Sequence, residues 1–153
     1  QAFAPESLDN FRKAVARLQS LAVEVKWVSG IMDDFEDIAS RHIAMTKAEW
    51  AKTLAGAWET HGALFRAHTA MEMLIGLQVQ QQEVEEGQLG RSKLREELEA
   101  AMDTHGIDVW ITPGALQGIA PHSLASTGDS KGQLPWTHAG LPTLSLPVAL
   151  DDV

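Results

Sequence analysis

Apolar residues recur at helical spacing near the start of the chain. Leu8, Phe11, Val15 and Leu18 follow one another at steps of three and four residues, after Pro5. This spacing places them on one face of a helix, and proline is well suited to the first turn because its φ is already fixed. We therefore predict an amphipathic helix that begins near Pro5.

A second helical pattern follows the acidic pair Asp33-Asp34, which we expect to cap it. Two later stretches, Thr46–Glu49 and Thr69–Glu72, match the capping box, so the sequence predicts a helix start at each. Aromatic and aliphatic residues then recur at helical spacing, which favours core packing over an aromatic ligand cage: Trp50, Leu54, Trp58, His61 and Phe65.

The stretch Gln80–His105 is polar, with few and widely spaced apolar residues. We interpret it as one long surface helix that is either continuous or broken at Gly87 or Gly90, because glycine weakens a helix interior. Gly106 is suited to ending this helix in the left-handed conformation.

Three stretches instead have the patterns of strands: the first and last alternate apolar and polar residues with a period of two, and the middle one is a short apolar run closed by Pro113-Gly114. They are Val23–Val28, Ile107–Thr112 and Leu141–Leu150. This alternation is typical of half-buried strands, and Pro147 favours an edge or a bulge in the last of them. Helices combined with strands predict an α/β fold.

Composition narrows the class of protein. The 153 residues correspond to one domain, and the formal net charge of −9 argues against a nucleic-acid partner. The sequence has no cysteine, which excludes disulfides and thiolate nucleophiles, and no apolar run is long enough to span a membrane. Gln1 is not an initiator methionine, so we expect the start to be a cut end of a longer protein.

Candidate chemistry is sparse. The six histidines form no zinc-binding motif, and His61 with His68 is a weak pair without a third ligand. No serine stands in a GxSxG turn. Asp129, flanked by glycine in the long loop before Trp136, is the best-placed acid, although an aspartate here also suits a turn that bonds its own backbone.

Five motifs in the last third of the chain resemble, in their order and spacing, the C-terminal half of amidase signature enzymes. They are Asp108–Pro113 (DVWITP), Thr127–Asp129 (TGD), Pro135–Thr137 (PWT), Ala139–Pro142 (AGLP) and Leu144–Pro147 (LSLP). None is specific alone, and the ordered set carries the resemblance. Upstream of these motifs the likeness is looser, but it extends over most of the chain.

The resemblance implies the C-terminal part of the amidase signature fold, with helices packed on part of a large mixed sheet. Residues 1–153 would then form a single partial domain. Enzymes of this family use a Ser–cis-Ser–Lys triad, and this sequence has neither the Gly/Ser-rich segment nor a matching lysine. We therefore expect no catalytic residue, no metal and no cofactor in this chain.

By the same resemblance, the chain would be part of an amidase that hydrolyses carboxylic amides through a serine acyl-enzyme. It would supply scaffold and one wall of the substrate cleft, with Asp129, Trp136 and Thr137 as candidate substrate-binding residues. The expected ligand is a small amide, in a cytoplasmic protein with no nucleic-acid or membrane partner. The isolated chain is expected to self-associate through the unpaired part of its sheet.

Two alternatives remain open. A glutamine-dependent amidotransferase subunit resembles this pattern but carries a tyrosine, and this chain has none. A non-catalytic helical interaction module would explain the missing triad, although it explains the Gly/Pro/Trp-containing motifs less well.

Overall fold

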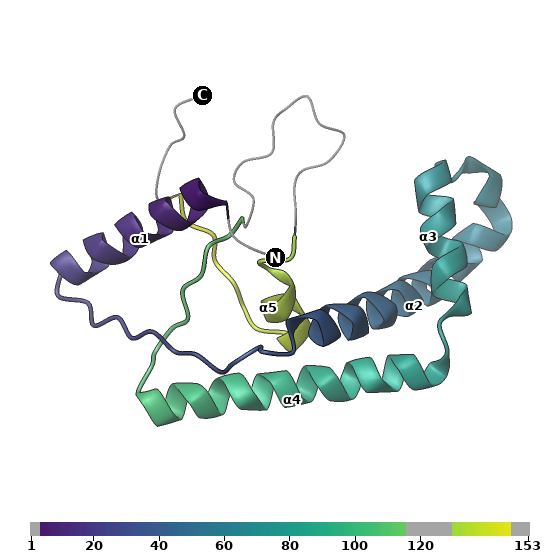
Figure 1. Ribbon diagram of the computed structural model, residues 1–153. Coiled ribbons are helices and arrows are strands. Elements are labelled where there is room, and N and C mark those ends of the chain that lie inside the picture. Colours follow the sequence, from purple (N-terminus) through teal and green to yellow (C-terminus); the bar gives the residue numbers. More distant parts are fainter. Residues whose placement is uncertain (1–3, 116–129, 148–153) are drawn as a thin grey trace.

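The described part of the chain is built from helices joined by extended segments. The computed structural model describes residues 4–115 and 130–147 (Figure 1). Its helices are α1 (Pro5–Ser20), α2 (Phe35–His61), the short 3-10 helix η1 (Gly62–Leu64), α3 (Ala67–Gln78), α4 (Gln81–His105) and α5 (Leu134–Ala139).

The long helices α2 and α4 lie side by side and run in opposite directions (Figure 1). Helix α3 packs on α2 at one end of this pair, and α5 packs on both α2 and α4 at the other end. The main core lies at the α5 end, where six residues are buried together: Ile38, Ala39, Leu94, Leu98, Leu134 and Ala139. Helix α1 lies apart, and the ring of Phe11 meets Trp27 edge to face at 6.2 Å.

Glycines allow α2 to approach its neighbours closely. A Cβ atom at Gly76 of α3 would lie 2.8 Å from the Cβ of Ala51 and closer still to the backbone oxygen of Lys47. A Cβ at Gly87 of α4 would lie 2.7 Å from the Cβ of Met45. Since real Cβ atoms do not come so close to other atoms, these contacts between helix backbones require glycine.

The predicted helices at Pro5 and after Asp34 are confirmed, but the predicted capping boxes are wrong. Helix α2 continues through Thr46, whose hydroxyl donates to the backbone oxygen of His42 at 2.8 Å. Helix α3 begins before Thr69, at Ala67. A hydroxyl residue inside a helix can bond back to the preceding turn, so the four-residue pattern alone does not define a start.

The long helix before Gly106 is confirmed, and Gly106 ends α4 in the left-handed region at φ 60°. The backbone N–H of Ile107 then donates to the oxygen of Met102 at 2.9 Å, which closes the last turn. Neither Gly87 nor Gly90 breaks the helix, because both lie where other helices pack against α4.

The predicted α/β fold with a large mixed sheet is wrong. No strand occurs among residues 4–115 and 130–147, so Val23–Val28, Ile107–Thr112 and the described part of Leu141–Leu150 are extended but unpaired. Their apolar side chains are largely exposed, including Trp27 and Leu144. Alternation alone produces an extended chain, whereas a strand also needs a neighbouring backbone, and these three segments do not supply one to each other.

We predict opposite effects for two Gly-to-Ala substitutions. Gly76→Ala should destabilise the chain by about 1–3 kcal/mol, because the new methyl overlaps the backbone of α2. Gly56→Ala, on α2 with no atom within 4 Å of the new Cβ, should stabilise it by about 0.5–1 kcal/mol. Urea unfolding followed by circular dichroism measures both, and equal effects would contradict the close-approach role of Gly76.

Candidate functional site

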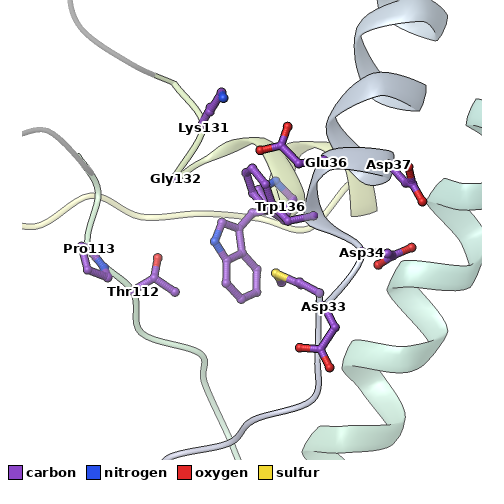
Figure 2. A pocket seen from close by; sticks show the side chains of 12 residues that line it. Asp33, Asp34, Glu36, Asp37, Thr112, Pro113, Lys131, Gly132 and Trp136 are labelled. Atoms are coloured by element: carbon purple, nitrogen blue, oxygen red, sulfur yellow. The ribbon is translucent and has the colours of Figure 1, made fainter. Parts of the chain in front are cut away.

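A cavity of about 610 Å³ opens between the start of α2 and the start of α5. Three parts of the chain line it: residues 32–37, the extended Thr112-Pro113, and the start of α5 with the turn before it, through Lys131, Gly132, Pro135 and Trp136. In Figure 2, Trp136 stands in the middle of this group, with Thr112 and Pro113 on one side and Asp33 and Asp34 on the other. The volume lies within the range of about 300–1,000 Å³ usual for small-molecule sites.

Helix α5 sets the position of Trp136. Leu134 and Pro135 are buried and fix the start of the helix, while Trp136 remains partly exposed. The indole ring also packs against Trp110, with ring centroids 6.3 Å apart. Trp136 therefore offers a flat apolar surface, and its contact with Trp110 helps to hold the ring in place.

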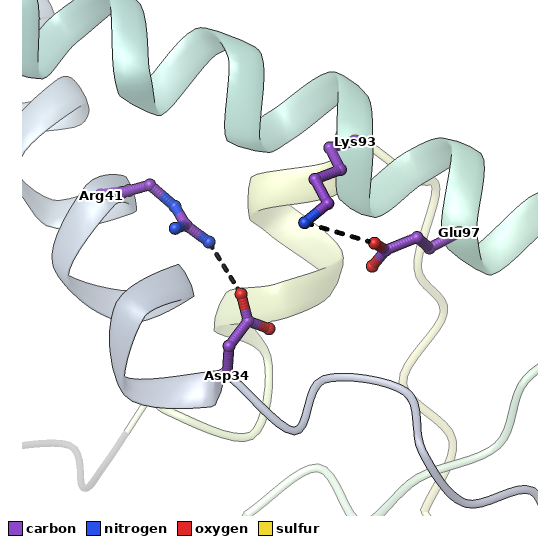
Figure 3. Close-up of polar contacts among 4 residues, drawn as sticks. All are labelled: Asp34, Arg41, Lys93 and Glu97. Atoms are coloured by element: carbon purple, nitrogen blue, oxygen red, sulfur yellow. Dashed lines mark hydrogen bonds and ion pairs between the residues drawn. The ribbon is translucent and has the colours of Figure 1, made fainter.

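The opposite side of the cavity is formed by the turn that leads into α2. Met32 adopts a φ of 65°, in the left-handed region that side chains other than glycine rarely occupy. Asp34 stands at the start of α2, and its carboxylate accepts a hydrogen bond from Arg41 at 3.1 Å (Figure 3). Arg41 lies seven residues further along, about two turns of α2, and this ion pair orients the carboxylate without burying it.

The three candidate substrate-binding residues have different positions. Trp136 lines the cavity. Thr137 is exposed and is not among the lining residues, and its hydroxyl donates to the backbone oxygen of Gln133 at 3.1 Å. Asp129 lies outside the described residues. A role in substrate binding remains a prediction for all three.

Sequence reasoning missed several lining residues, notably Met32, Phe35 and Lys131. The residues from Met32 to Phe35 resembled only a helix start, and no pattern in the sequence brings them to Trp136, about one hundred positions later. The turn residues around Gly30 were the available signal, because an irregular backbone before a helix is where sites often form.

A cluster of basic side chains lies where α5 packs on α2 and α4. His138 is fully buried, and its ring meets that of His42 on α2 edge to face at 5.4 Å. Burial, then His42, Arg41 and Arg91, lower the pKa of His138 to about 4. Burial and then Arg91 also lower the pKa of His42, against a weaker effect of Glu49.

Neither the cavity nor the cluster around His138 resembles a metal centre. No group of three or more metal-ligating side chains occurs in the described parts of the chain, and His138 and His42 form only a pair. Among the helices of residues 4–115 and 130–147, none combines the length and apolar character needed to cross a bilayer.

Comparison with protein-family models, curated proteins and solved structures found no match to this chain.

Proposed function

We propose that this chain forms one wall of the substrate site of an amidase that cleaves carboxylic amides through a serine acyl-enzyme. One observation carries the proposal. Two of the segments that resemble amidase signature motifs, Thr112-Pro113 and Pro135-Trp136, are more than twenty residues apart in sequence and line the same cavity. Sequence order did not require this, since a long loop separates them.

The lining suits a small molecule with an apolar group next to an amide. The indole of Trp136 and the ring of Pro135 supply apolar area, and Thr112 supplies a hydroxyl at the rim. A group stacked on Trp136 would gain about 0.5–1.5 kcal/mol beyond simple burial if it is aromatic.

The chemical step proposed is acyl transfer. A serine oxygen attacks the amide carbonyl, the amine leaves with a proton, and water then releases the acid. No serine of this sequence stands in the Gly/Ser-rich signature that the resemblance requires, so the proposal places the nucleophile outside these 153 residues. The role of this chain is to bind and orient the group beside the scissile amide.

We predict that this chain binds acetanilide through Trp136. Trp136→Ala should weaken binding by about tenfold, because the flat surface opposite Thr112 is lost. Trp50→Ala is the matched control, since Trp50 lines a separate hollow of about 390 Å³ between α2 and α3. Calorimetric titration measures both variants, and equal weakening by the two substitutions would contradict the assignment.

We also predict that these 153 residues alone hydrolyse no amide. Incubation with acetanilide should release no aniline above the buffer rate, and a fluorophosphonate should label no serine. Turnover that the reagent abolishes would show that a nucleophile lies within this chain, and would overturn the role proposed for it.

A different function, as a helical interaction module, is favoured by the outer face of α3. Four apolar side chains of this helix are 40–54 % exposed: Met71, Leu74, Ile75 and Leu77. Besides His68, the only titratable residue of α3 is Glu72, and its carboxylate pairs with Lys47 of α2 at 2.8 Å. An uncharged helix face on a chain of net charge −9 is the surface on which two copies can meet with least repulsion.

This second candidate predicts self-association through α3. Light scattering after size exclusion should show a dimer at about 100 µM, and Leu74→Glu should make the chain monomeric. Leu89→Glu is the control, because Leu89 is 72 % exposed on the charged helix α4. A monomer at all concentrations, or equal loss in both variants, would rule out this use of α3.

A further inference from the structure

His138 occupies an unusual position for a titratable side chain. It has no exposed surface, and neither of its ring nitrogens has a hydrogen-bond partner among the described residues. Buried polar atoms are nearly always paired, since an unpaired one has lost its bonds to water without replacement. A buried neutral imidazole has the free-energy cost of its unpaired nitrogens, and a protonated imidazole would add the larger cost of a buried charge.

The helices around His138 present cations and a second imidazole. Helix α2 contributes His42 and Arg41, and the buried Nε of Arg41 has no hydrogen-bond partner within residues 4–115 and 130–147. Helix α4 contributes Arg91, whose Nε donates to the backbone oxygen of His138 at 3.0 Å. Helix α5 itself, from Leu134 to Ala139, holds no other titratable residue.

Two carboxylates, one at the start of α2 and one on α4, pair with bases (Figure 3), and Glu49 of α2 acts on His42. Asp34 accepts from Arg41 at 3.1 Å, and Glu97 lies 3.7 Å from Lys93. In the described part of the chain, the groups that act on the His138 ring are His42, Arg41 and Arg91, and none of them is a carboxylate. A proton on His138 would therefore meet like charges and no counterion.

The packing leaves little room to relieve that charge in place. A Cβ atom at Gly90 of α4 would lie 3.4 Å from Nε2 of His138 and 2.9 Å from Nε of Arg41. Helix α5, in contrast, is only six residues long and ends at Gly140 in the left-handed region. Release of this short helix is the smallest movement that returns the ring to water.

Helix α5 also forms part of the cavity lining. Pro135 and Trp136 line the cavity on one side of α5, and His138 anchors the other side. We infer that the docking of α5 onto α2 and α4 is a proton-controlled joint: protonation of His138 releases α5 and removes Pro135 and Trp136 from the cavity. This joint would regulate whatever the cavity binds, and it does not depend on the proposed amidase function.

The direction of the pH dependence follows from the two states. In docked α5 the pKa of His138 is lowered to about 4, whereas in released α5 it returns toward 6.5. Above pH 6.5 both states are neutral and docking is at full strength. As the pH falls from 6.5 to 4, the released state gains the proton first, which by pH 4 weakens docking by roughly 160-fold relative to neutral pH. His42, whose pKa is also lowered, acts in the same direction.

The test follows two NMR signals of the full chain, without ligand, from about pH 7.5 to 4. The carbon-bound ring protons of His138 report protonation, and the indole N–H of Trp136 reports its surroundings. The two should change together, at a midpoint below pH 6.5, while far-UV circular dichroism keeps the signal of α2 and α4.

His138→Phe keeps the ring volume without the titration, so the Trp136 signal should then stay unchanged down to pH 4. His61→Phe, at the exposed end of α2, should retain the wild-type change. The joint is refuted if wild-type His138 titrates near 6.5, if it titrates while Trp136 does not respond, or if all helices unfold at the same midpoint. The wild-type signals decide the matter even if His138→Phe does not fold.

Discussion

Close approach of helix backbones is the constraint on which the described structure depends. Helix α2 contacts α3, α4 and α5, and at its crossings with α3 and α4 the neighbouring residue is glycine: Gly76, Gly87 and Gly90. Because glycine has no Cβ, α2 approaches α3 and α4 near its middle, which leaves Met45 and Met73 fully buried between them. The first turns of α2 and the last turns of α4 are thereby held at a fixed spacing, and α5 packs across them.

Helices were predictable from the sequence because their signals are local. Proline at the start of α1 and Gly106 at the end of α4 each act within one helical turn. The apolar spacing within a helix can likewise be recognised without knowing the rest of the chain. The strands were not predictable in the same way. The alternation at Val23–Val28 describes the side chains, whereas a strand is defined by backbone pairing with a segment that may be a hundred residues away. The exposed Trp27 and Leu144 are the result of alternation without that pairing.

The residues of the candidate site likewise differ in whether the sequence alone could identify them. Trp136 was recognised because it stands in a short motif, and it lines the cavity. Met32 and Asp34 were not, because only the packing of α5 against the start of α2 brings them to Trp136. His138 gave no signal at all: a histidine in the sequence looks the same whether it is exposed, like His61, or enclosed by two arginines and a second histidine. Burial and partners are properties of the assembled helices, so no reading of the sequence alone could supply them.

The residues of α4 that contact α2 and the core lie along one side of the helix. Gly87, Gly90, Leu94 and Leu98 follow at steps of three and four residues, and they meet, in turn, Met45, Arg41 and the buried core beside α5. One residue more or less between Gly90 and Leu94 would rotate the two glycines by about 100° around the helix axis relative to the two leucines. The glycines could then face α2, or the leucines could face the core, but not both. Homologous chains should therefore vary in length at the ends of α4 and keep the count within it.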